Sequence, residues 1–385
     1  MTAIVQITPE IGPGTGVGAV AFHLEREWQR LGVDVRRFTL AEAGGSWLPT
    51  PGGGLGGRLA LIGRVMWFST VGTRRARSHL RRHPELLSIC HNDAVAGDVY
   101  VNHGIVQAAM RARGHYRVRM ARNPLHLFTT TRDRFRYSST GSHRLVVNLV
   151  TDEERLLRES YPRLAIPTVV IGNGVDIESF RPPTATERDA ARGELGLGTD
   201  DRMVLFIGNE FGRKGLPLLV QAVARLGPEV RLVVIGGTPD MVASESAGQA
   251  AVSLGRRLRF AGAHPDPRPW LHAADALAMP SAYESYGLVV LEALACGVPV
   301  VATPTGCVPD VVTDGVNGAV VEATAADLAA GLSRVFALDP VAARAAARES
   351  AERHSWAAVA RRYLDVLTGL RAEPGPSAGV RGDVS

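Results

Sequence analysis

The chain has 385 residues, of which 45% are hydrophobic and 21% charged, so it is a globular protein rather than a disordered one and is long enough for two domains. The net charge of +5 is unevenly spread, because residues 1–150 hold 20 arginines against 9 acidic residues and the remainder is net acidic. This basic half favours an anionic partner, whether a phosphorylated molecule, an anionic lipid surface or nucleic acid.

Among the 43 basic residues 42 are arginine, which indicates a coding bias and singles out Lys214 as the one lysine of the chain. The three cysteines (Cys90, Cys296, Cys307) are odd in number and form no C-x-x-C pair. They therefore support neither a disulfide framework nor a thiolate metal site.

The N-terminal part alternates short apolar runs with amphipathic segments, which is typical of βαβ units and parallel sheets. We expect a strand at Ala3–Thr8, a Gly-rich loop, a helix at Val17–Leu31 and a second strand at Val33–Thr39. No charged segment precedes the first strand, so we expect no signal peptide and a cytoplasmic location.

Residues 41–57 are rich in Gly and Pro, and we expect a mobile loop there. The segment Arg58–Arg82 mixes large apolar residues with seven arginines. It fits either a surface helix with a solvated basic face or an interfacial helix lying on anionic lipid. Its longest apolar stretch, Leu59–Gly72, is interrupted by Arg64 and is too short to span a bilayer.

The βα rhythm then continues to residue 371, and we expect a second domain to begin near Pro167–Ile171. The amphipathic stretch Ser355–Leu370 predicts a final helix, and the tail after Ala372 is expected to be disordered. Further expected elements are strands at Leu86–Cys90, Asp98–Asn102, Leu145–Leu149, Met203–Ile207, Arg231–Ile235, Leu258–Phe260, Ala276–Met279, Pro299–Ala302 and Ala319–Val321, and a helix at Asp152–Tyr161 capped by Thr151.

The most informative segment is Pro280–Val301, in which a strand leads into a loop carrying Glu284 and Gly287 opens a short helix. Glu292 is the one polar side chain of that helix, so we expect a carboxylate carried into the interior. Such burial is unfavourable unless hydrogen-bond donors meet the carboxylate. A ribose diol supplies two donors, and a neighbouring backbone group or arginine is the structural alternative.

The loop Tyr286–Gly287–Leu288 places free backbone N–H groups at the start of the same helix. A helix N-terminus binds phosphate because its donors and its dipole both favour negative charge. A phosphate site followed by a ribose acceptor together indicate a nucleotide site.

The spacing Glu284-x7-Glu292 in this setting resembles the E-x7-E motif of retaining GT-B glycosyltransferases, especially glycosyltransferase family 4. Three other segments resemble the same family in the same order: IGNGVDIESFRP (Ile171–Pro182, with Gly172 in place of the usual proline), FIGNEFGRKGL (Phe206–Leu216) and TGCVPDVVTDGVNGAVV (Thr305–Val321). The resemblance covers most of the chain and is weaker over residues 41–140.

The resemblance implies that Lys214 and Arg213 bind the donor diphosphate and stabilise the departing nucleoside diphosphate, beside Asn209. It implies that Glu284 contacts sugar hydroxyls or supports the reacting centre, and it leaves open whether the reaction uses a covalent intermediate or same-face attack. The remaining donor-binding positions that it implies are Ser285, Tyr286, Gly287, Leu288 and Glu292.

In the N-terminal domain, the resemblance implies that Gly16 lets the backbone approach the donor phosphate. The G-x-G-x-x-A match around it is a weak dinucleotide signal, because the partnering acid is missing from the end of the second strand. His103 follows a strand and matches the family histidine that faces the donor sugar, and His91 competes for this role.

The sequence therefore predicts an α/β protein of the GT-B fold, with two Rossmann-like domains facing across a cleft and a C-terminal helix crossing back to the first domain. The expected N-terminal acceptor-binding domain comprises residues 1–168 and 355–371, the nucleotide-sugar-binding domain residues 169–354, and the tail residues 372–385. No D-x-D pair occurs, so we expect no metal and no cofactor beyond the nucleoside-diphosphate sugar donor.

The expected function is a retaining glycosyltransferase of hexosyltransferase type, acting on a glycan, glycolipid or small metabolite. One alternative is a non-hydrolysing sugar-nucleotide epimerase, which shares the fold and would convert the donor sugar without an acceptor. A remote alternative is an Arg-rich nucleic-acid-binding protein, which explains the basic half but leaves Glu284, Glu292 and Lys214 without a role. A further expected partner is an anionic membrane, contacted peripherally through Arg58–Arg82.

Overall fold

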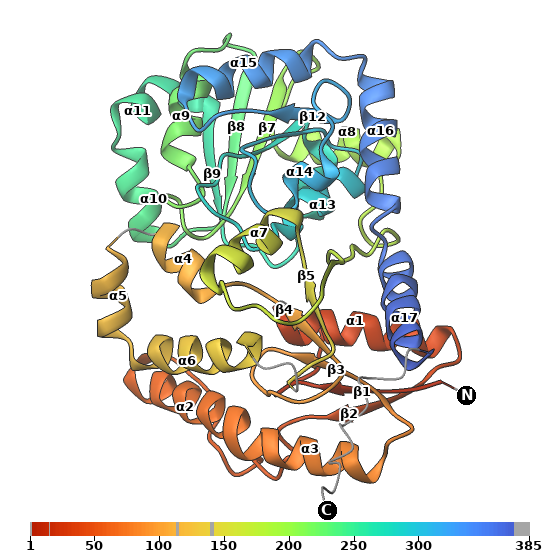
Figure 1. Ribbon diagram of the computed structural model, residues 1–385. Coiled ribbons are helices and arrows are strands. Elements are labelled where there is room, and N and C mark those ends of the chain that lie inside the picture. The colour runs from red at the N-terminus through yellow and green to blue at the C-terminus, as the bar shows by residue number, and fades with distance from the viewer. Residues whose placement is uncertain (1, 15, 113–114, 139–141, 373–385) are drawn as a thin grey trace, which may run out of the picture.

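The computed structural model describes residues 2–14, 16–112, 115–138 and 142–372. It shows two α/β domains, each built on a six-stranded sheet, one lying above the other (Figure 1). All strand pairs described in the two sheets are parallel. The tail that was expected to be disordered, residues 373–385, lies outside the described residues.

The N-terminal sheet has the strand order β2-β1-β3-β4-β5-β6. The order reverses between β1 and β3, and ligands of open α/β sheets bind outside the carboxyl ends of the strands at such a point. The domain consists of β1 (Ala3–Ile7), α1 (Val17–Arg30), β2 (Asp34–Phe38), α2 (Gly54–Trp67), a π-helical turn (Phe68–Gly72), α3 (Thr73–Arg82), β3 (Leu87–His91), β4 (Val99–Asn102), α4 (Val106–Ala112), α5 (Tyr116–Arg122), α6 (Pro124–Ser138), β5 (Leu145–Asn148), α7 (Thr151–Ser160) and β6 (Thr168–Val170).

The C-terminal sheet has the strand order β12-β11-β10-β7-β8-β9, with its reversal between β7 and β10. Its elements are α8 (Ala185–Glu194), β7 (Arg202–Ile207), α9 (Leu216–Ala224), β8 (Val230–Ile235), α10 (Pro239–Ser246), α11 (Gln249–Leu254), a 3-10 turn (Gly255–Arg257), β9 (Leu258–Gly262), α12 (Arg268–Ala273), β10 (Ala276–Met279), α13 (Leu288–Ala295), β11 (Val300–Ala302), α14 (Val308–Val311), β12 (Gly318–Val320), α15 (Ala325–Phe336) and α16 (Pro340–Glu352).

The central strands are buried on both faces because helices cover the two sides of each sheet. The strand β10, with the sequence ALAM, is buried throughout, and β3 is buried from Leu87 to His91. The strand β1 is also apolar except at Gln6, which is fully buried. A polar side chain at such a position needs a hydrogen-bond partner, and the partner of Gln6 lies in the candidate site.

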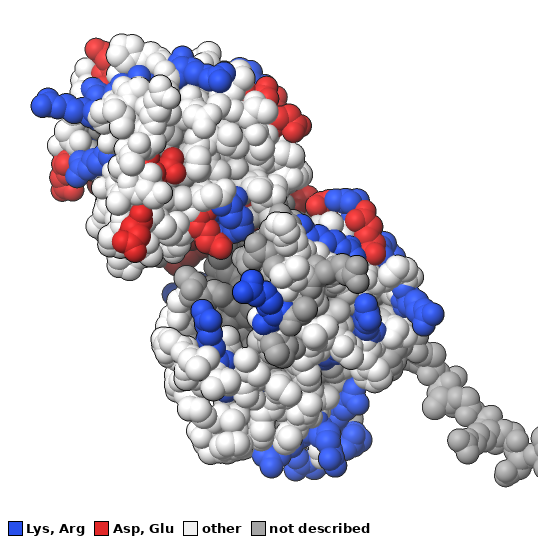
Figure 2. Space-filling view, turned by 90° about the vertical axis from the view of Figure 1, so that its left-hand side faces the viewer, with Lys and Arg blue, Asp and Glu red and all other residues white. Residues whose placement is uncertain are grey.

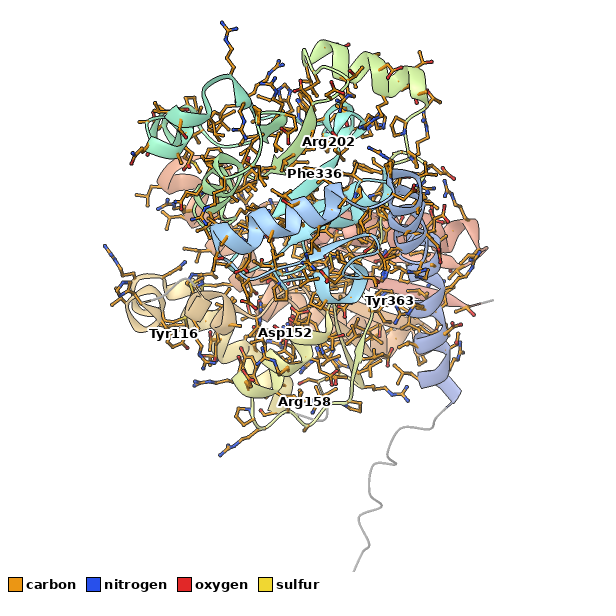
Figure 3. The ribbon with its side chains drawn as sticks, turned by 90° about the horizontal axis from the view of Figure 1, so that it is seen from above. Tyr116, Asp152, Arg158, Arg202, Phe336 and Tyr363 are labelled. Atoms are coloured by element: carbon orange, nitrogen blue, oxygen red, sulfur yellow. The ribbon has the colours of Figure 1, made fainter. Side chains whose placement is uncertain are left out.

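The last helix, α17 (Trp356–Ala372), leaves the C-terminal domain and packs against α1, as expected (Figure 1). The indole N–H of Trp28 donates a hydrogen bond of 2.9 Å to the carbonyl of Ala360, and Tyr363 lies edge-on to the Trp28 ring. Seen from above, α15 crosses the C-terminal domain and α17, with Tyr363, lies at its flank (Figure 3). The fold is thus the expected GT-B arrangement.

Three local expectations were wrong. The strand β6, expected to open the second domain, pairs with β5 and is the edge strand of the first sheet. The helix α2 begins at Gly54, inside the segment expected to be a loop. Thr151 is the first residue of α7 rather than its cap, because its hydroxyl donates to Asp310 of the other domain at 2.8 Å.

Candidate functional site

The loop after β7 carries Lys214 at the carboxyl edge of the C-terminal sheet, next to the strand-order reversal. A Cβ at Gly208 would collide with the lysine stem, so this glycine allows the stem to lie across the end of β7. Arg213 donates to the carbonyl of Tyr283 and bonds Glu210 at 2.6 Å. Asn209 is exposed, and its side-chain oxygen accepts from the N–H of Gly237 at 3.3 Å.

The loop after β10 brings Glu284 to the two cations. Its Oε1 lies 3.0 Å from Nζ of Lys214 and 3.3 Å from Nη1 of Arg213. The hydroxyl of Ser281 donates to the same oxygen at 2.9 Å. The Glu284 side chain is only 10% exposed. One carboxylate therefore pairs with two cations in a partly desolvated place, and Glu210 adds a second negative charge beside Arg213.

Gly287 is the N-cap of α13, and its φ of +86° is a conformation that other residues rarely adopt. Its first turn points free N–H groups toward the same edge of the sheet as Lys214. Glu292 is partly exposed rather than carried fully into the interior, because Leu288, Val289 and Glu292 form a face of α13 that the core leaves partly open.

Within the described part of the chain, no hydrogen bond to the Glu292 carboxylate is found, and none contributes to the shift of its pKa. Burial raises its pKa to about 7, although the charge of Lys214 acts in the opposite direction. The structural alternative, in which a backbone group or an arginine donates to this carboxylate, is therefore not observed. Its free lone pairs remain available to a ligand.

In the N-terminal domain, Gly16 caps α1 with a φ of +83°, and His103 follows β4 directly. Nε2 of His103 lies 3.1 Å from Nδ1 of His91, and Nε2 of His91 lies 3.1 Å from Oε1 of Gln6. His91 is fully buried, whereas His103 is partly exposed. The two histidines are thus connected, with His103 on the solvent side.

The two domains meet close to these residues. A Cβ at Gly104, next to His103, would lie 3.3 Å from Oγ of Ser285. The hydroxyl of Tyr286 donates to the carbonyl of Asn173 at 2.8 Å. A Cβ at Gly172 would lie 2.6 Å from that hydroxyl, which explains why glycine stands there.

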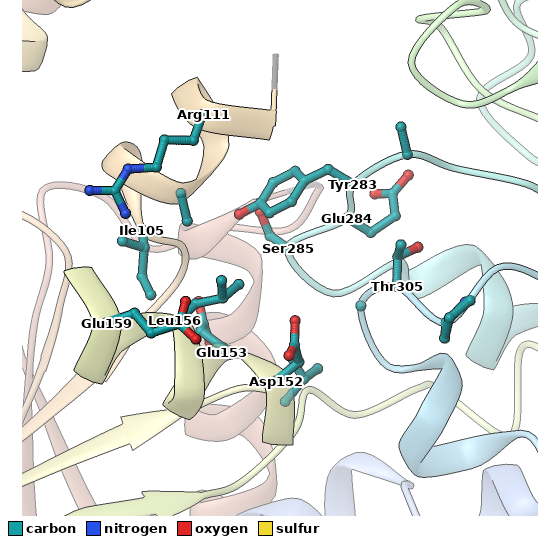
Figure 4. A pocket seen from close by; sticks show the side chains of 15 residues that line it. Ile105, Arg111, Asp152, Glu153, Leu156, Glu159, Tyr283, Glu284, Ser285 and Thr305 are labelled. Atoms are coloured by element: carbon teal, nitrogen blue, oxygen red, sulfur yellow. The ribbon is translucent and has the colours of Figure 1, made fainter. Parts of the chain in front are cut away.

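A cavity of about 300 Å³ lies between the domains beside Glu284 (Figure 4). Its walls come from α4, α7 and the loops after β10 and β11. Glu153 is buried in the wall, and the N–H of Leu149 donates to it at 2.8 Å. Burial raises the pKa of Glu153 to about 8. Other polar side chains that line the cavity are those of Arg111, Asp152, Glu159, Tyr283, Ser285 and Thr305.

The structure therefore brings Lys214, Arg213 and Glu284 into direct contact, with Glu292 close enough to sense the lysine charge. Sequence reasoning missed Ser281, Glu153 and Gln6. Gln6 carries a signal, as a polar residue inside an apolar strand, whereas Glu153 lies in an acidic first turn that looks like a solvated helix start.

Among the residues described, no group of three or more His, Cys, Asp or Glu side chains is arranged to hold a metal ion. In the same part of the chain, no helix is long and apolar enough to cross a membrane.

The architecture defines the fold: two parallel α/β domains with a returning C-terminal helix form a GT-B fold. The structure resembles that of WaaG, a glycosyltransferase involved in lipopolysaccharide biosynthesis, with a TM-score of 0.71 and 20% identity over 95% of this chain and all of that one. It also resembles Anabaena Alr3699/HepE in complex with UDP-glucose, with a TM-score of 0.63 and 20% identity over 94% of this chain and 99% of that one.

Residues 187–354 match the family model of "Glycosyl transferases group 1", and this stretch contains all six strands of the C-terminal sheet. The chain is 36% identical over 248 residues to the D-inositol 3-phosphate glycosyltransferase of Mycolicibacterium smegmatis, covering 61% of this chain and 56% of that protein. It is 41% identical over 211 residues to the protein of the same name from Xylanimonas cellulosilytica, covering 51% and 50%. The chain thus spans about half the length of these curated relatives.

Proposed function

We propose that this protein is a retaining, metal-independent glycosyltransferase that moves a sugar, of the hexosyl type, from a nucleoside-diphosphate sugar to an acceptor. The observation that carries the proposal is the cluster of Lys214, Arg213 and Glu284 at the strand-order reversal of the C-terminal sheet. The family match of this domain and the E-x7-E spacing support it.

The donor diphosphate would bind at the two cationic side chains, Lys214 and Arg213. Lys214 is a compact charge, and Arg213 can make forked contacts with phosphate oxygens. Both cations pair with Glu284, which holds their side chains in place. Positive charge that is already oriented stabilises the negative charge developing on the leaving nucleoside diphosphate, which makes a divalent metal unnecessary for this role.

The nucleoside ribose would bind Glu292, whose carboxylate has free lone pairs on a partly exposed face of α13. Backbone N–H groups of Gly287 and Leu288 at the start of α13 would assist the phosphates. Tyr286 would hold the loop by its bond to Asn173. We assign Glu284 to the sugar hydroxyls and to the two cations, and we assign it no nucleophilic role.

The N-terminal domain would complete the site through Gly16 and His103, and closure of the cleft would exclude water and limit hydrolysis of the donor. The acceptor would enter the cavity beside Glu284, between α4 and α7. The named activity of the relatives makes D-inositol 3-phosphate the first acceptor to test, alongside glycans and glycolipids.

The activity is tested by incubating the protein with UDP-, GDP-, ADP- and dTDP-hexoses in the presence of EDTA, with and without D-inositol 3-phosphate. Acceptor-dependent release of nucleoside diphosphate and a product that keeps the donor's anomeric configuration are expected. Conversion of the donor sugar without acceptor would instead identify the epimerase. An acceptor-dependent reaction that stops in EDTA would contradict the metal-independent mechanism.

We further propose that the α2 helix contacts the surface of an anionic membrane. Within α2 only Gly57 is buried, and Leu55 and Leu59 are 75% and 61% exposed. Basic side chains surround this part of the N-terminal domain on the face seen in Figure 2, where acidic ones are few. An exposed apolar face flanked by arginines is the arrangement of an interfacial helix.

Vesicle sedimentation tests this contact. Vesicles containing phosphatidylglycerol should bind the protein more than pure phosphatidylcholine vesicles, and Leu59→Glu should abolish most of the difference. The matched control is Val341→Glu, because Val341 is 76% exposed on the other domain. Equal losses in both variants, or no preference for the anionic vesicles, would show that α2 is an ordinary surface helix.

A further inference from the structure

Three side chains on adjacent strands form a hydrogen-bonded row that ends at the cleft. Gln6 lies in β1, His91 ends β3 and His103 follows β4, and these strands are neighbours in the sheet. Gln6 and His91 are both fully buried. Each member of the row is 3.1 Å from the next.

The direction of these hydrogen bonds follows from the buried end. The carbonyl of Ala21 can only accept, so the amide nitrogen of Gln6, 2.9 Å away, donates to it. Oε1 of Gln6 is therefore turned toward His91 and accepts its Nε2–H. Neutral His91 then has a bare Nδ1, which accepts from Nε2–H of His103.

His103 is consequently left with a bare Nδ1 on the other side of its ring from His91. The reverse direction would place the Gln6 oxygen against a bare nitrogen of His91 and leave two acceptors facing each other in a buried place, which is unfavourable. Gly104, the neighbour of His103, lies so near the loop after β10 that a Cβ on it would be 3.3 Å from Oγ of Ser285, so the His103 ring lies where the two domains face each other.

We propose that Gln6 and His91 are positioning residues that hold His103 as the Nε2–H tautomer, so that its Nδ1 accepts a hydrogen bond from a hydroxyl of the donor sugar. The proposal rests on the proposed function for its ligand and goes beyond it in assigning the direction of the bond. His103 then orients the sugar and does not protonate the leaving group.

The protonation states of His91 and His103 agree with this direction of the hydrogen bonds. Burial lowers the pKa of His103 to about 4. Burial and the neighbouring His103 together lower the pKa of His91 well below its ordinary value. Gln6 cannot titrate, and among the residues described no carboxylate is a cause of either shift. The row thus stays neutral at physiological pH and its direction is fixed.

The tautomer is measured directly by NMR of the full chain labelled with ¹⁵N-histidine. The signals of His103 are assigned as those that disappear in His103→Gln. The expected wild-type result between pH 6 and 8 is a proton on Nε2 and a bare Nδ1. Gln6→Met keeps the volume but removes the acceptor, so it should populate the Nδ1–H form of His103. It should also lower kcat/KM about tenfold, the worth of about one hydrogen bond.

The control is Ser88→Ala, a buried position in β3 that bonds Asp98 and does not touch the row. It should leave the tautomer and kcat/KM unchanged. A wild-type His103 protonated on Nδ1, or a tautomer that Gln6→Met does not alter, would overturn the proposal. If Gln6→Met fails to fold, the wild-type spectrum still decides. Because the spectrum needs no donor, absence of nucleotide-sugar binding would refute the proposed function without bearing on the row.

Discussion

Donor binding should depend on pH through Glu292. Burial raises the pKa of this carboxyl to about 7, against the opposing effect of Lys214. A ribose diol donates to the ionised form, so protons compete with the donor. For a pKa near 7 the ionised fraction falls about tenfold between pH 8 and pH 6, and the apparent Kd of the donor should rise about tenfold over that range.

The assay is a calorimetric titration with the intact nucleotide sugar, whose phosphates do not titrate in this range, at constant ionic strength. Glu292→Gln should bind more weakly at pH 8 by about ten- to a hundredfold, as the loss of a charged hydrogen bond does, and should lose the pH dependence. A wild-type Kd that is constant from pH 6 to 8, or an equal slope in Glu292→Gln, would refute the assignment.

The contribution of Glu292 to protein stability has the opposite pH dependence, so a change in stability cannot be mistaken for weaker donor binding. A raised folded-state pKa means that the folded protein holds the proton more tightly than the unfolded chain. The contribution of Glu292 to stability is therefore present below about pH 4.5 and is lost as the pH rises through about 7. Stability through Glu292 increases on acidification, whereas donor binding decreases.

Three other substitutions test separate parts of the structure. Lys214→Ala should lower turnover by about a hundredfold or more, because it removes a charge that stabilises the leaving group, and near-normal activity would refute that role. Arg136→Met should destabilise the protein by about 3–5 kcal/mol in urea unfolding, because Arg136 is fully buried and bonds Asp133 at 2.7 Å, and a loss below about 1 kcal/mol would contradict this. Gly172→Ala should cost about 1–3 kcal/mol through its clash with the Tyr286 hydroxyl, and less in a Tyr286→Phe background, so that additive losses would contradict the contact.

Much of the fold was predictable because buried parallel strands appear as short apolar runs. The strand β10 has the expected range, and β7 begins at Arg202, one residue before its expected start at Met203. The convergence of Lys214 and Glu284 was also predictable, since both follow strands whose carboxyl ends meet at one edge.

Other features depend on contacts that no local pattern specifies. The strand β6 carries three residues, TVV, and nothing in them shows to which sheet they belong. Thr151 looks like a helix cap, but its hydroxyl donates a hydrogen bond to Asp310, which is distant in sequence. Glu292 lies on an apolar helix, and its partial exposure depends on how the rest of the chain packs around that helix.

The central claim is that the Lys214 cluster binds a nucleoside-diphosphate sugar without metal. It is tested most directly by thermal-shift titration of UDP-, GDP-, ADP- and dTDP-sugars in EDTA, on wild type and Lys214→Ala. At least one donor should raise the Tm of wild type, and the shift should be largely lost in Lys214→Ala. Stabilisation by none of them, an undiminished shift in Lys214→Ala, or a shift that requires added Mg²⁺ would contradict the claim.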